Sequence, residues 1–287
     1  MAEPIARIGI FGLGLIGSAL AGRLLSAGFS VAGYDPEPER GAALSALGGT
    51  AASARDVWKA QAVFSCVFDT DQLAALIADA PETNTLLISM STCDPERMAD
   101  LSDAAEAKGI SLVEAPISGT SKALAAGDVL LLVAGDEAAI QRLDPVFNAL
   151  ARQYITVGDI GNGNRAKLAI NLVLGLHRAA LAEGMVFAEA LGLEPADFLA
   201  MAKASAAYSA VMDSKGQLMV DRDFAPQGRI VQSAKDFTLI RDSAAAKGQG
   251  LPFTETYLAM MEDALAAGEG DLDNSAVLLP IARTPAS

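Results

Sequence analysis

Short apolar segments rich in β-branched residues alternate with alanine- and leucine-rich segments through the first half of the chain. The short segments predict buried strands, and the longer segments between them predict helices. The predicted strands cover residues 5–11, 29–34, 62–68, 85–90, 111–115, 129–134 and 153–157. Parallel strands need crossover connections, which are right-handed and place helices on both faces of the sheet. Residues 1–158 are therefore predicted to form a doubly wound α/β domain with a mostly parallel sheet.

The strand pattern stops after Gly158, and the rest of the chain reads as alanine- and leucine-rich helices. Glycine, proline and asparagine gather at the breaks between them, at residues 192–195, 225–226, 248–252 and 268–274. The first of these helical segments is unusually long. We therefore expect residues 159–287 to form an all-helical C-terminal domain, joined to the first domain by a long interdomain helix.

Composition agrees with two globular domains, because 52% of the 287 residues are hydrophobic and 20% are charged. The formal net charge of −14 would repel the phosphates of nucleic acids and of anionic lipids. No segment approaches the ~18 uninterrupted apolar residues of a membrane helix. We expect neither a nucleic-acid nor a membrane partner, and a small anionic ligand must meet locally placed cations.

The two cysteines, Cys66 and Cys93, have the spacing of neither a metal site nor a disulfide framework. Such sparse cysteine usage favours a reducing compartment. A cytoplasmic protein without a bound metal is therefore expected.

A glycine-rich segment, Gly12-Leu13-Gly14-Leu15-Ile16-Gly17, directly follows the first predicted strand and opens the first predicted helix. In this context the glycines make a tight turn, admit a pyrophosphate to the backbone, and pack the helix against the strand. The phosphates would lie at the helix N-terminus, where unpaired N–H groups and the helix dipole favour an anion. The segment predicts a Rossmann-type dinucleotide site.

Asp35 follows the second predicted strand, 18 residues after Gly17. At this place a carboxylate accepts hydrogen bonds from ribose hydroxyls and repels a 2′-phosphate, which favours NAD over NADP. The alternative is that Asp35 only begins the turn Asp35-Pro36-Glu37-Pro38. Equal use of the two cofactors would contradict the first interpretation.

Three further segments go beyond a generic dinucleotide fold. They are Glu114-Ala-Pro-Ile-Ser118-Gly119-Thr120, Gly161-Asn-Gly163-Asn-Arg-Ala-Lys167-Leu-Ala-Ile-Asn171 and Lys235-Asp236-Phe-Thr-Leu239. In this order, and over essentially the whole chain, they resemble the β-hydroxyacid dehydrogenase family, which includes 3-hydroxyisobutyrate dehydrogenases, tartronate semialdehyde reductases and 6-phosphogluconate dehydrogenases. The second segment is the most specific of the three.

The resemblance implies roles for several residues of these motifs and of the neighbouring loops. Lys167 would be the catalytic acid/base, and Asn171 with the Ser118, Gly119 and Thr120 turn would hold the substrate. Thr92 and Lys235 would lie beside the nicotinamide, and Val67 and Phe68 would contact the adenosine side. Relatives commonly have Leu-Pro where this chain has Phe68-Asp69, and a second glycine where it has Thr120. Phe68-Asp69 changes the loop on the adenosine side, and Thr120 adds a hydroxyl to the substrate turn and removes backbone freedom from it.

Physical reasoning supports the role of Lys167 independently. Lys167 and Asn171 are four residues apart on a predicted helix, so both side chains project from one face. Oxidation of a hydroxyl needs a base within hydrogen-bond reach while the nicotinamide carries the redox chemistry. A lysine can serve when desolvation or neighbouring cations lower its pKa.

The sequence thus predicts an NAD-dependent oxidoreductase that interconverts a small β-hydroxy acid and the matching aldehyde or keto acid, with its active site between the domains. A carbonyl or imine reductase of the same fold and a non-catalytic NAD(H)-binding protein are the alternatives. The resemblance also implies a homodimer or homotetramer, assembled through the helical domain.

Overall fold

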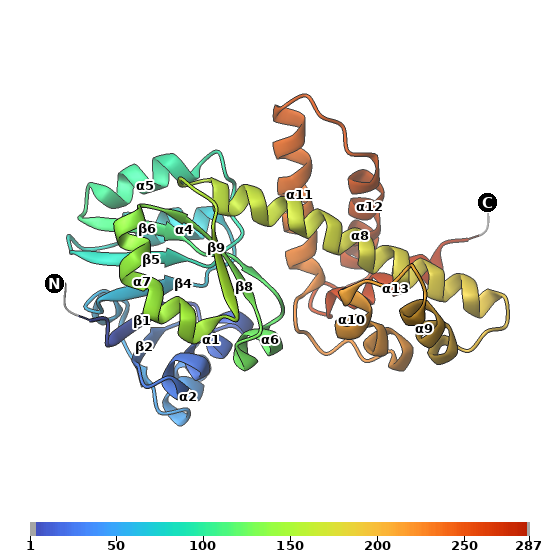
Figure 1. Cartoon of the computed structure of the whole chain (residues 1–287), viewed down its shortest axis with the longest axis horizontal. Helices are drawn as coiled ribbons and strands as arrows, with labels where there is room; N and C mark the ends of the chain where they lie inside the picture. Colours follow the sequence, from blue (N-terminus) through green and yellow to red (C-terminus); the bar gives the residue numbers. More distant parts are fainter. Residues whose placement is uncertain (1–3, 286–287) are drawn as a thin grey trace. The chain divides into compact units, whose positions relative to one another are not determined.

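The computed structural model describes residues 4–285, which fall into two compact units that divide between Lys167 and Leu168. The first unit is an α/β unit with a mostly parallel sheet, and the second is helical (Figure 1). The predicted fold class is confirmed. The domain boundary predicted after residue 158 lies ahead of the long helix α8, and the compact units divide inside that helix.

Among its described residues, the first unit contains nine strands and seven helices ahead of α8. The strands are β1 (Arg7–Phe11), β2 (Ser30–Tyr34), β3 (Thr50–Ala51), β4 (Ala62–Ser65), β5 (Thr85–Ser89), β6 (Ile110–Glu114), β7 (Ile117–Ser118), β8 (Leu130–Gly135) and β9 (Gln153–Thr156). The helices are α1 (Leu15–Ser26), α2 (Pro38–Ala46), α3 (Ala54–Val57), α4 (Thr70–Ala78), α5 (Met98–Glu106), α6 (Ser121–Ala126) and α7 (Glu137–Leu150).

The strand order is β3-β2-β1-β4-β5-β6-β8-β7, with β9 paired to β8. Strands β1 to β6 are parallel, whereas β8 runs antiparallel to β6 and β7. The order reverses between β1 and β4, which are neighbours in the sheet but not in the chain. In open α/β sheets, ligands bind at such a switch point, outside the carboxyl ends of the strands.

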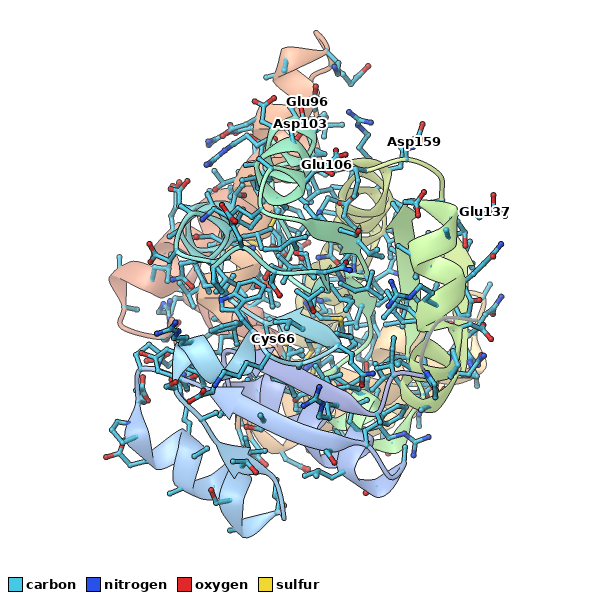
Figure 2. The ribbon with its side chains drawn as sticks, turned by 90° about the vertical axis from the view of Figure 1, so that its left-hand side faces the viewer. Cys66, Glu96, Asp103, Glu106, Glu137 and Asp159 are labelled. Carbon is cyan, nitrogen blue, oxygen red and sulfur yellow. The ribbon has the colours of Figure 1, made fainter. Side chains whose placement is uncertain are left out.

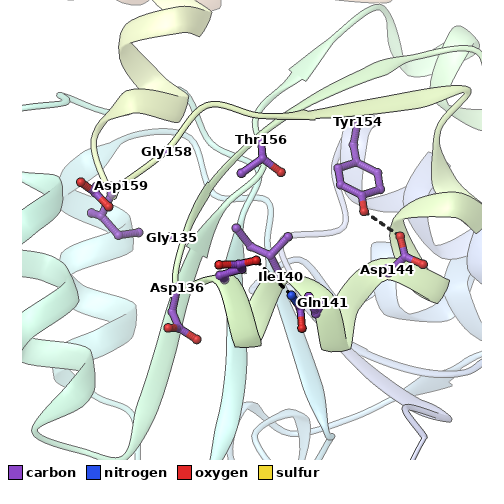
Figure 3. Close-up of a pocket in the computed structure, with 11 residues that line it drawn as sticks. Gly135, Asp136, Ile140, Gln141, Asp144, Tyr154, Thr156, Gly158 and Asp159 are labelled. Carbon is purple, nitrogen blue, oxygen red and sulfur yellow. Dashed lines mark hydrogen bonds between the residues drawn. The ribbon is translucent and has the colours of Figure 1, made fainter.

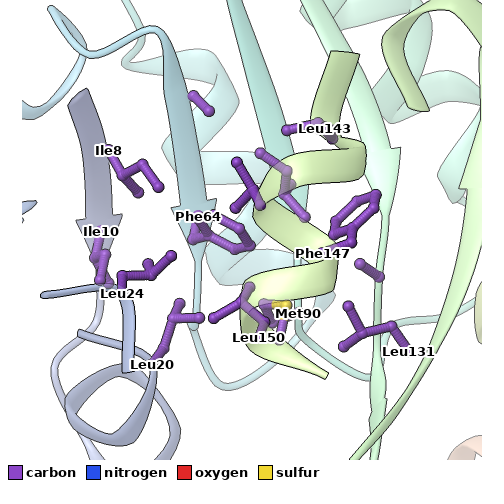
Figure 4. Packing of buried hydrophobic residues seen from close by; sticks show 14 of the residues in the cluster. Ile8, Ile10, Leu20, Leu24, Phe64, Met90, Leu131, Leu143, Phe147 and Leu150 are labelled. Carbon is purple, nitrogen blue, oxygen red and sulfur yellow. The ribbon is translucent and has the colours of Figure 1, made fainter. Parts of the chain in front are cut away.

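Apolar side chains cover both faces of this sheet, because neighbouring residues in a strand point to opposite sides. Phe64 packs in a cluster with residues of α1 and α7, including Leu20 and Phe147 (Figure 4). Val63 instead joins a second cluster with residues of α3, α4 and α5, including Leu73. Two buried faces explain why these strands appear in the sequence as continuous apolar runs.

The second unit is built from helices around its own apolar core. Its elements are the greater part of α8 (Asn162–Ala190), then α9 (Pro195–Ala204), α10 (Ala210–Asp221), α11 (Ile230–Ala246), α12 (Pro252–Ala266), the 3₁₀ turn η1 (Asn274–Val277) and α13 (Leu278–Arg283). The rings of Phe237 and Tyr257 lie 4.0 Å apart between α11 and α12. Gly175 of α8 faces Phe237, where an added Cβ would come within 2.4 Å of the ring. Packing rather than turn geometry therefore requires this glycine.

Among the described residues, α8 is the single helix long and apolar enough to cross a bilayer, with a mean hydropathy of 1.3 in its best window. One such helix does not by itself indicate a membrane protein, because the central helix of a helical bundle passes the same test.

Candidate active site

The glycine turn joins β1 to α1, and the backbone itself requires two of its three glycines. Gly12 has φ +83°, and a Cβ there would lie 2.7 Å from the Cys66 carbonyl oxygen. A Cβ at Gly17 would lie 1.8 Å from the Gly12 carbonyl oxygen. Any larger residue at either position would force the turn apart, so these glycines fix the tight connection and the contact of helix with strand.

Gly14 differs, because the nearest atom to an added Cβ there is the Arg40 guanidinium at 3.9 Å. The protein leaves this side of the turn open. Gly14 is also the N-cap of α1, with no side-chain hydrogen bond capping the helix and no acidic residue in its first turn. An open cradle at an uncapped helix N-terminus is what a pyrophosphate needs, so the turn fits a dinucleotide.

Asp35 lies at the carboxyl end of β2, against this turn. Its carboxylate accepts hydrogen bonds from the backbone N–H of Leu13 at 2.7 Å and of Glu37 at 3.0 Å, and pairs with Arg40 at 3.2 Å. Burial alone would raise the pKa of Asp35, but these donors outweigh it and leave the pKa below its ordinary value. Asp35 therefore stays a carboxylate. It begins the turn after β2 and also binds the backbone of the glycine turn at Leu13.

The loops after β4 and β5 lie at the same edge of the sheet. The Ser91 hydroxyl donates to the Val67 carbonyl oxygen at 2.6 Å and joins the two loops. The Phe68 N–H donates to the Gln72 side chain at 2.9 Å, while Thr92 is half-buried. The structure thus gathers the glycine turn, Asp35, Val67, Phe68 and Thr92 at the carboxyl ends of β1, β2, β4 and β5.

Cys66 lies at the base of this region, directly after β4 (Figure 2). Burial raises the pKa of its thiol to about 12, because desolvation disfavours the thiolate. Cys93, after β5, is fully buried.

The Ser118, Gly119 and Thr120 turn connects β7 to α6. Gly119 has φ +150°, and a Cβ there would meet the Val129 side chain at 2.7 Å. The Thr120 hydroxyl accepts from the Ala123 N–H at 3.2 Å and caps α6. Thr120 thus has a structural role that a second glycine could not fill, while its hydroxyl hydrogen stays available as a donor.

Lys167 lies in the second turn of α8 and is 8% exposed. A lysine this buried is uncommon unless it is paired or functional, which separates Lys167 from an ordinary helical surface residue. Asn171 follows it by four residues on the same helix face.

A cluster in the second unit contains Asn171, Lys235 and Asp236, a motif residue for which no role was predicted. One carboxylate oxygen of Asp236 accepts from the Asn171 amide at 2.7 Å, and the other pairs with the Lys235 ammonium at 3.1 Å. Asp236 and Lys235 are 15% and 17% exposed. The structure thus brings Asn171 and Lys235 together through Asp236. The only sequence signal that could have identified Asp236 is its position next to Lys235.

An open groove in the first unit lies elsewhere, along α7 and β9, with a volume of about 990 Å³ (Figure 3). Four carboxylates line it, Asp136, Glu137, Asp144 and Asp159, and Tyr154 donates to Asp144 at 2.6 Å. None of the residues that line it is a lysine or an arginine. This groove would repel an anionic substrate or a dinucleotide.

The glycine turn, the strand order and the acid after β2 define a nucleotide-binding oxidoreductase fold. Comparison with known proteins is more specific: residues 7–158 match the NAD binding domain of 6-phosphogluconate dehydrogenase, and residues 161–281 match the NAD-binding domain of NADP-dependent 3-hydroxyisobutyrate dehydrogenase. The chain belongs to the β-hydroxyacid dehydrogenase family of NAD(P)-dependent oxidoreductases, which confirms the resemblance.

Individual relatives match over nearly their whole length. A 2-(hydroxymethyl)glutarate dehydrogenase of Eubacterium barkeri is 29% identical over 96% of this chain and 95% of the relative. A 2-hydroxy-3-oxopropionate reductase of Escherichia coli is 28% identical, over 95% and 96%. The crystal structure of 3-hydroxyisobutyrate dehydrogenase from Salmonella typhimurium superposes with a TM-score of 0.87 at 31% identity, over 95% of this chain and 99% of that chain.

Proposed function

We propose that this enzyme interconverts a small β-hydroxy acid and the corresponding aldehyde or keto acid with NAD, and that Lys167 is its general acid/base. The observation that carries the proposal is a buried lysine one helical turn from an asparagine whose amide is held by Asp236. The names of the similar dehydrogenase and reductase describe small hydroxy and oxo acids, which agrees with this substrate class.

The bound nicotinamide would accept or supply the hydride. Neutral Lys167 takes the proton of the substrate hydroxyl, and protonated Lys167 returns it in the reducing direction. The Asp236 contact fixes the rotation of the Asn171 amide, so the Asn171 oxygen has one direction in which to receive a substrate hydroxyl. Ser118 and the backbone beside Gly119 supply the neutral donors that a carboxylate requires.

The proposal includes a preference for NAD. The Asp35 carboxylate at the glycine turn favours ribose hydroxyls and opposes a 2′-phosphate, while Arg40, five residues later, already pairs with Asp35. The ratio of kcat/KM for the two cofactors tests the preference. Asp35→Asn should lower this ratio toward one, and a wild-type enzyme that uses NADP as well as NAD would contradict the role of Asp35.

The decisive experiment assays a panel of small 3-hydroxy acids and their semialdehydes by nicotinamide absorbance, in both directions, with wild-type enzyme and Lys167→Ala. Positioned acid–base catalysis typically contributes about 10²–10⁴-fold, so kcat should fall by at least 10²-fold. NADH binding should be retained. The control is Lys59→Ala, which removes a lysine that is 70% exposed.

A loss of kcat below about tenfold, or ~1.4 kcal/mol, is too small for an essential acid/base and would refute the role of Lys167. Turnover of cyclic imines without any hydroxy acid would instead identify an imine reductase, and tight NADH binding without turnover would identify a cofactor-binding protein.

We also propose that the enzyme is a dimer formed through α8. Val173, Phe187 and Leu191, at the exposed side of this helix and its end, are 51%, 64% and 64% exposed, and their spacing places them on one face. Exposed apolar residues gathered on one face indicate an interface. Light scattering after gel filtration should show a dimer that Leu191→Asp weakens and that Leu47→Asp, at another exposed leucine, leaves intact. A wild-type monomer would refute this.

A further inference from the structure

Glu114, the last residue of β6, is a fully buried carboxylate outside the proposed chemistry. It accepts hydrogen bonds from the backbone N–H of Gly161, from the backbone N–H of Asn164 at 3.0 Å, and from the Asn164 side-chain amide. Burial raises the pKa of Glu114 while these donors oppose the rise. Glu114 therefore anchors the backbone donors at the start of α8 to the central sheet.

The Asn164 amide continues this network in the opposite direction. Its oxygen accepts the backbone N–H of Cys93 at 2.7 Å, and both residues are fully buried. Cys93 follows Thr92, the residue placed beside the nicotinamide by resemblance. One amide thus joins the acid at the end of β6 to the loop after β5.

The first turn of α8 also sits close against the sheet. A Cβ at Gly163 would lie 2.9 Å from the Glu114 Cβ and 3.1 Å from the Leu132 carbonyl oxygen. Only a glycine allows this approach. The hydrogen bonds of Glu114 and Asn164 then fix both the rotation of the first turn of α8 and its distance from the sheet.

We propose that Glu114 and Asn164 are positioning residues, which fix the direction of the Lys167 side chain relative to the nicotinamide-side loop at Thr92. Lys167 lies three residues after Asn164, about 4.5 Å along the axis of the same rigid helix. A displacement of ~1 Å in such a group can cost about 10²-fold in rate. The inference rests on the proposed role of Lys167.

The test compares Asn164→Ala with Asn162→Ala. Asn162 lies in the same turn, but its side chain accepts only from the Arg165 guanidinium at the surface among the contacts that the structure resolves. Asn164→Ala should lower kcat about 10- to 100-fold, with the dissociation constant of NADH within threefold of wild type. The solvent deuterium isotope effect on kcat should rise, because the proton transfer to or from Lys167 becomes misaligned. The pH profile of kcat/KM should shift for the same reason. Asn162→Ala should change none of these.

A merely structural role would lower the melting temperature and the active fraction but leave the isotope effect and pH profile unchanged, and that result would overturn the proposal. Equal kcat in the two variants would also overturn it. If Asn164→Ala does not fold, Asn164→Ser is tested in its place, because a serine can satisfy one of the two hydrogen-bond partners. Its loss of kcat should be smaller than that expected for Asn164→Ala. Failure of both to fold would assign the pair to folding alone.

The outcome can be separated from failure of the proposed function. If Lys167→Ala keeps its activity, or if the wild type turns over no substrate of the panel, the proposed function fails. If Lys167→Ala is inactive while Asn164→Ala is fully active, only the positioning inference fails.

Discussion

Replacing Asp236 by asparagine isolates the electrostatic contribution of the cluster that holds Asn171. The side chain keeps its size, and its oxygen can still accept the Asn171 amide, whose present contact is 2.7 Å. The charge is lost, however, and the new NH₂ group faces the Lys235 ammonium, now 3.1 Å from a carboxylate oxygen. Asp236→Asn should therefore loosen both partners without opening a cavity.

The magnitude follows from these two contacts. A hydrogen bond to a charged group contributes about 1.5–3 kcal/mol, and a neutral one about 0.5–1.5 kcal/mol. Because both side chains are mostly buried, the loss of transition-state stabilisation should be about 2 kcal/mol. This loss corresponds to a roughly 30-fold lower kcat/KM.

Steady-state kinetics with the best substrate, together with NADH titration, would measure this loss. The matched control is Asp242→Asn on the same helix, where a 60% exposed carboxylate pairs with Arg241. This substitution should change kcat/KM less than twofold, because exposed pairs contribute little. A loss below threefold for Asp236→Asn, or equal losses in the two variants, would refute the positioning of Asn171 by Asp236.

The remaining predictions concern the stability of the second unit and the glycine turn. Lys215→Met should lower the free energy of unfolding by about 3–5 kcal/mol in urea titrations, because it leaves Asp273, now bound to Lys215 at 2.8 Å, as an unpaired buried charge. Adding Asp273→Asn should recover part of that loss, and purely additive losses would contradict the coupling. Burial would raise the pKa of Asp273, but Lys215 and backbone donors hold it below its ordinary value. The stabilisation by this carboxylate should therefore be present at neutral pH and disappear in acid as the pH falls through its folded pKa, which pH-dependent melting would show. Gly17→Ala should lower the melting temperature, whereas Gly14→Ala should weaken NADH binding without doing so, since only the first adds a Cβ within 1.8 Å of backbone. The opposite pattern in calorimetry and titration would refute the proposed cradle.

The strands and the glycine turn could be predicted because their signals are local. Continuous apolar runs mark strands buried on both faces, and a glycine triplet between strand and helix has few other uses. The two-residue strands β3 and β7 were not predicted, because two residues carry no periodicity. The antiparallel direction of β8 depends on pairing with distant strands, which an isolated run does not encode.

The buried polar contacts were beyond sequence reasoning for a similar reason. Glu114 and Asn164 are 50 residues apart, and each lies in a motif whose apparent purpose is substrate binding. Asp236 is 65 residues from Asn171, so only the fold brings them together. Lys167 could be selected by its motif, but its low exposure is a property of the folded chain.

The thiol at the base of the nucleotide loops has a consequence for oxidative chemistry. Because burial raises the pKa of the Cys66 thiol to about 12, this half-buried side chain stays a protonated thiol at neutral pH. Peroxides and alkylating reagents attack the thiolate, so they find almost no nucleophile beside the cofactor loops, and Cys93 is buried from them as well. Turnover should consequently survive exposure to hydrogen peroxide or iodoacetamide. Covalent inhibitors directed at thiols should react only slowly in this region.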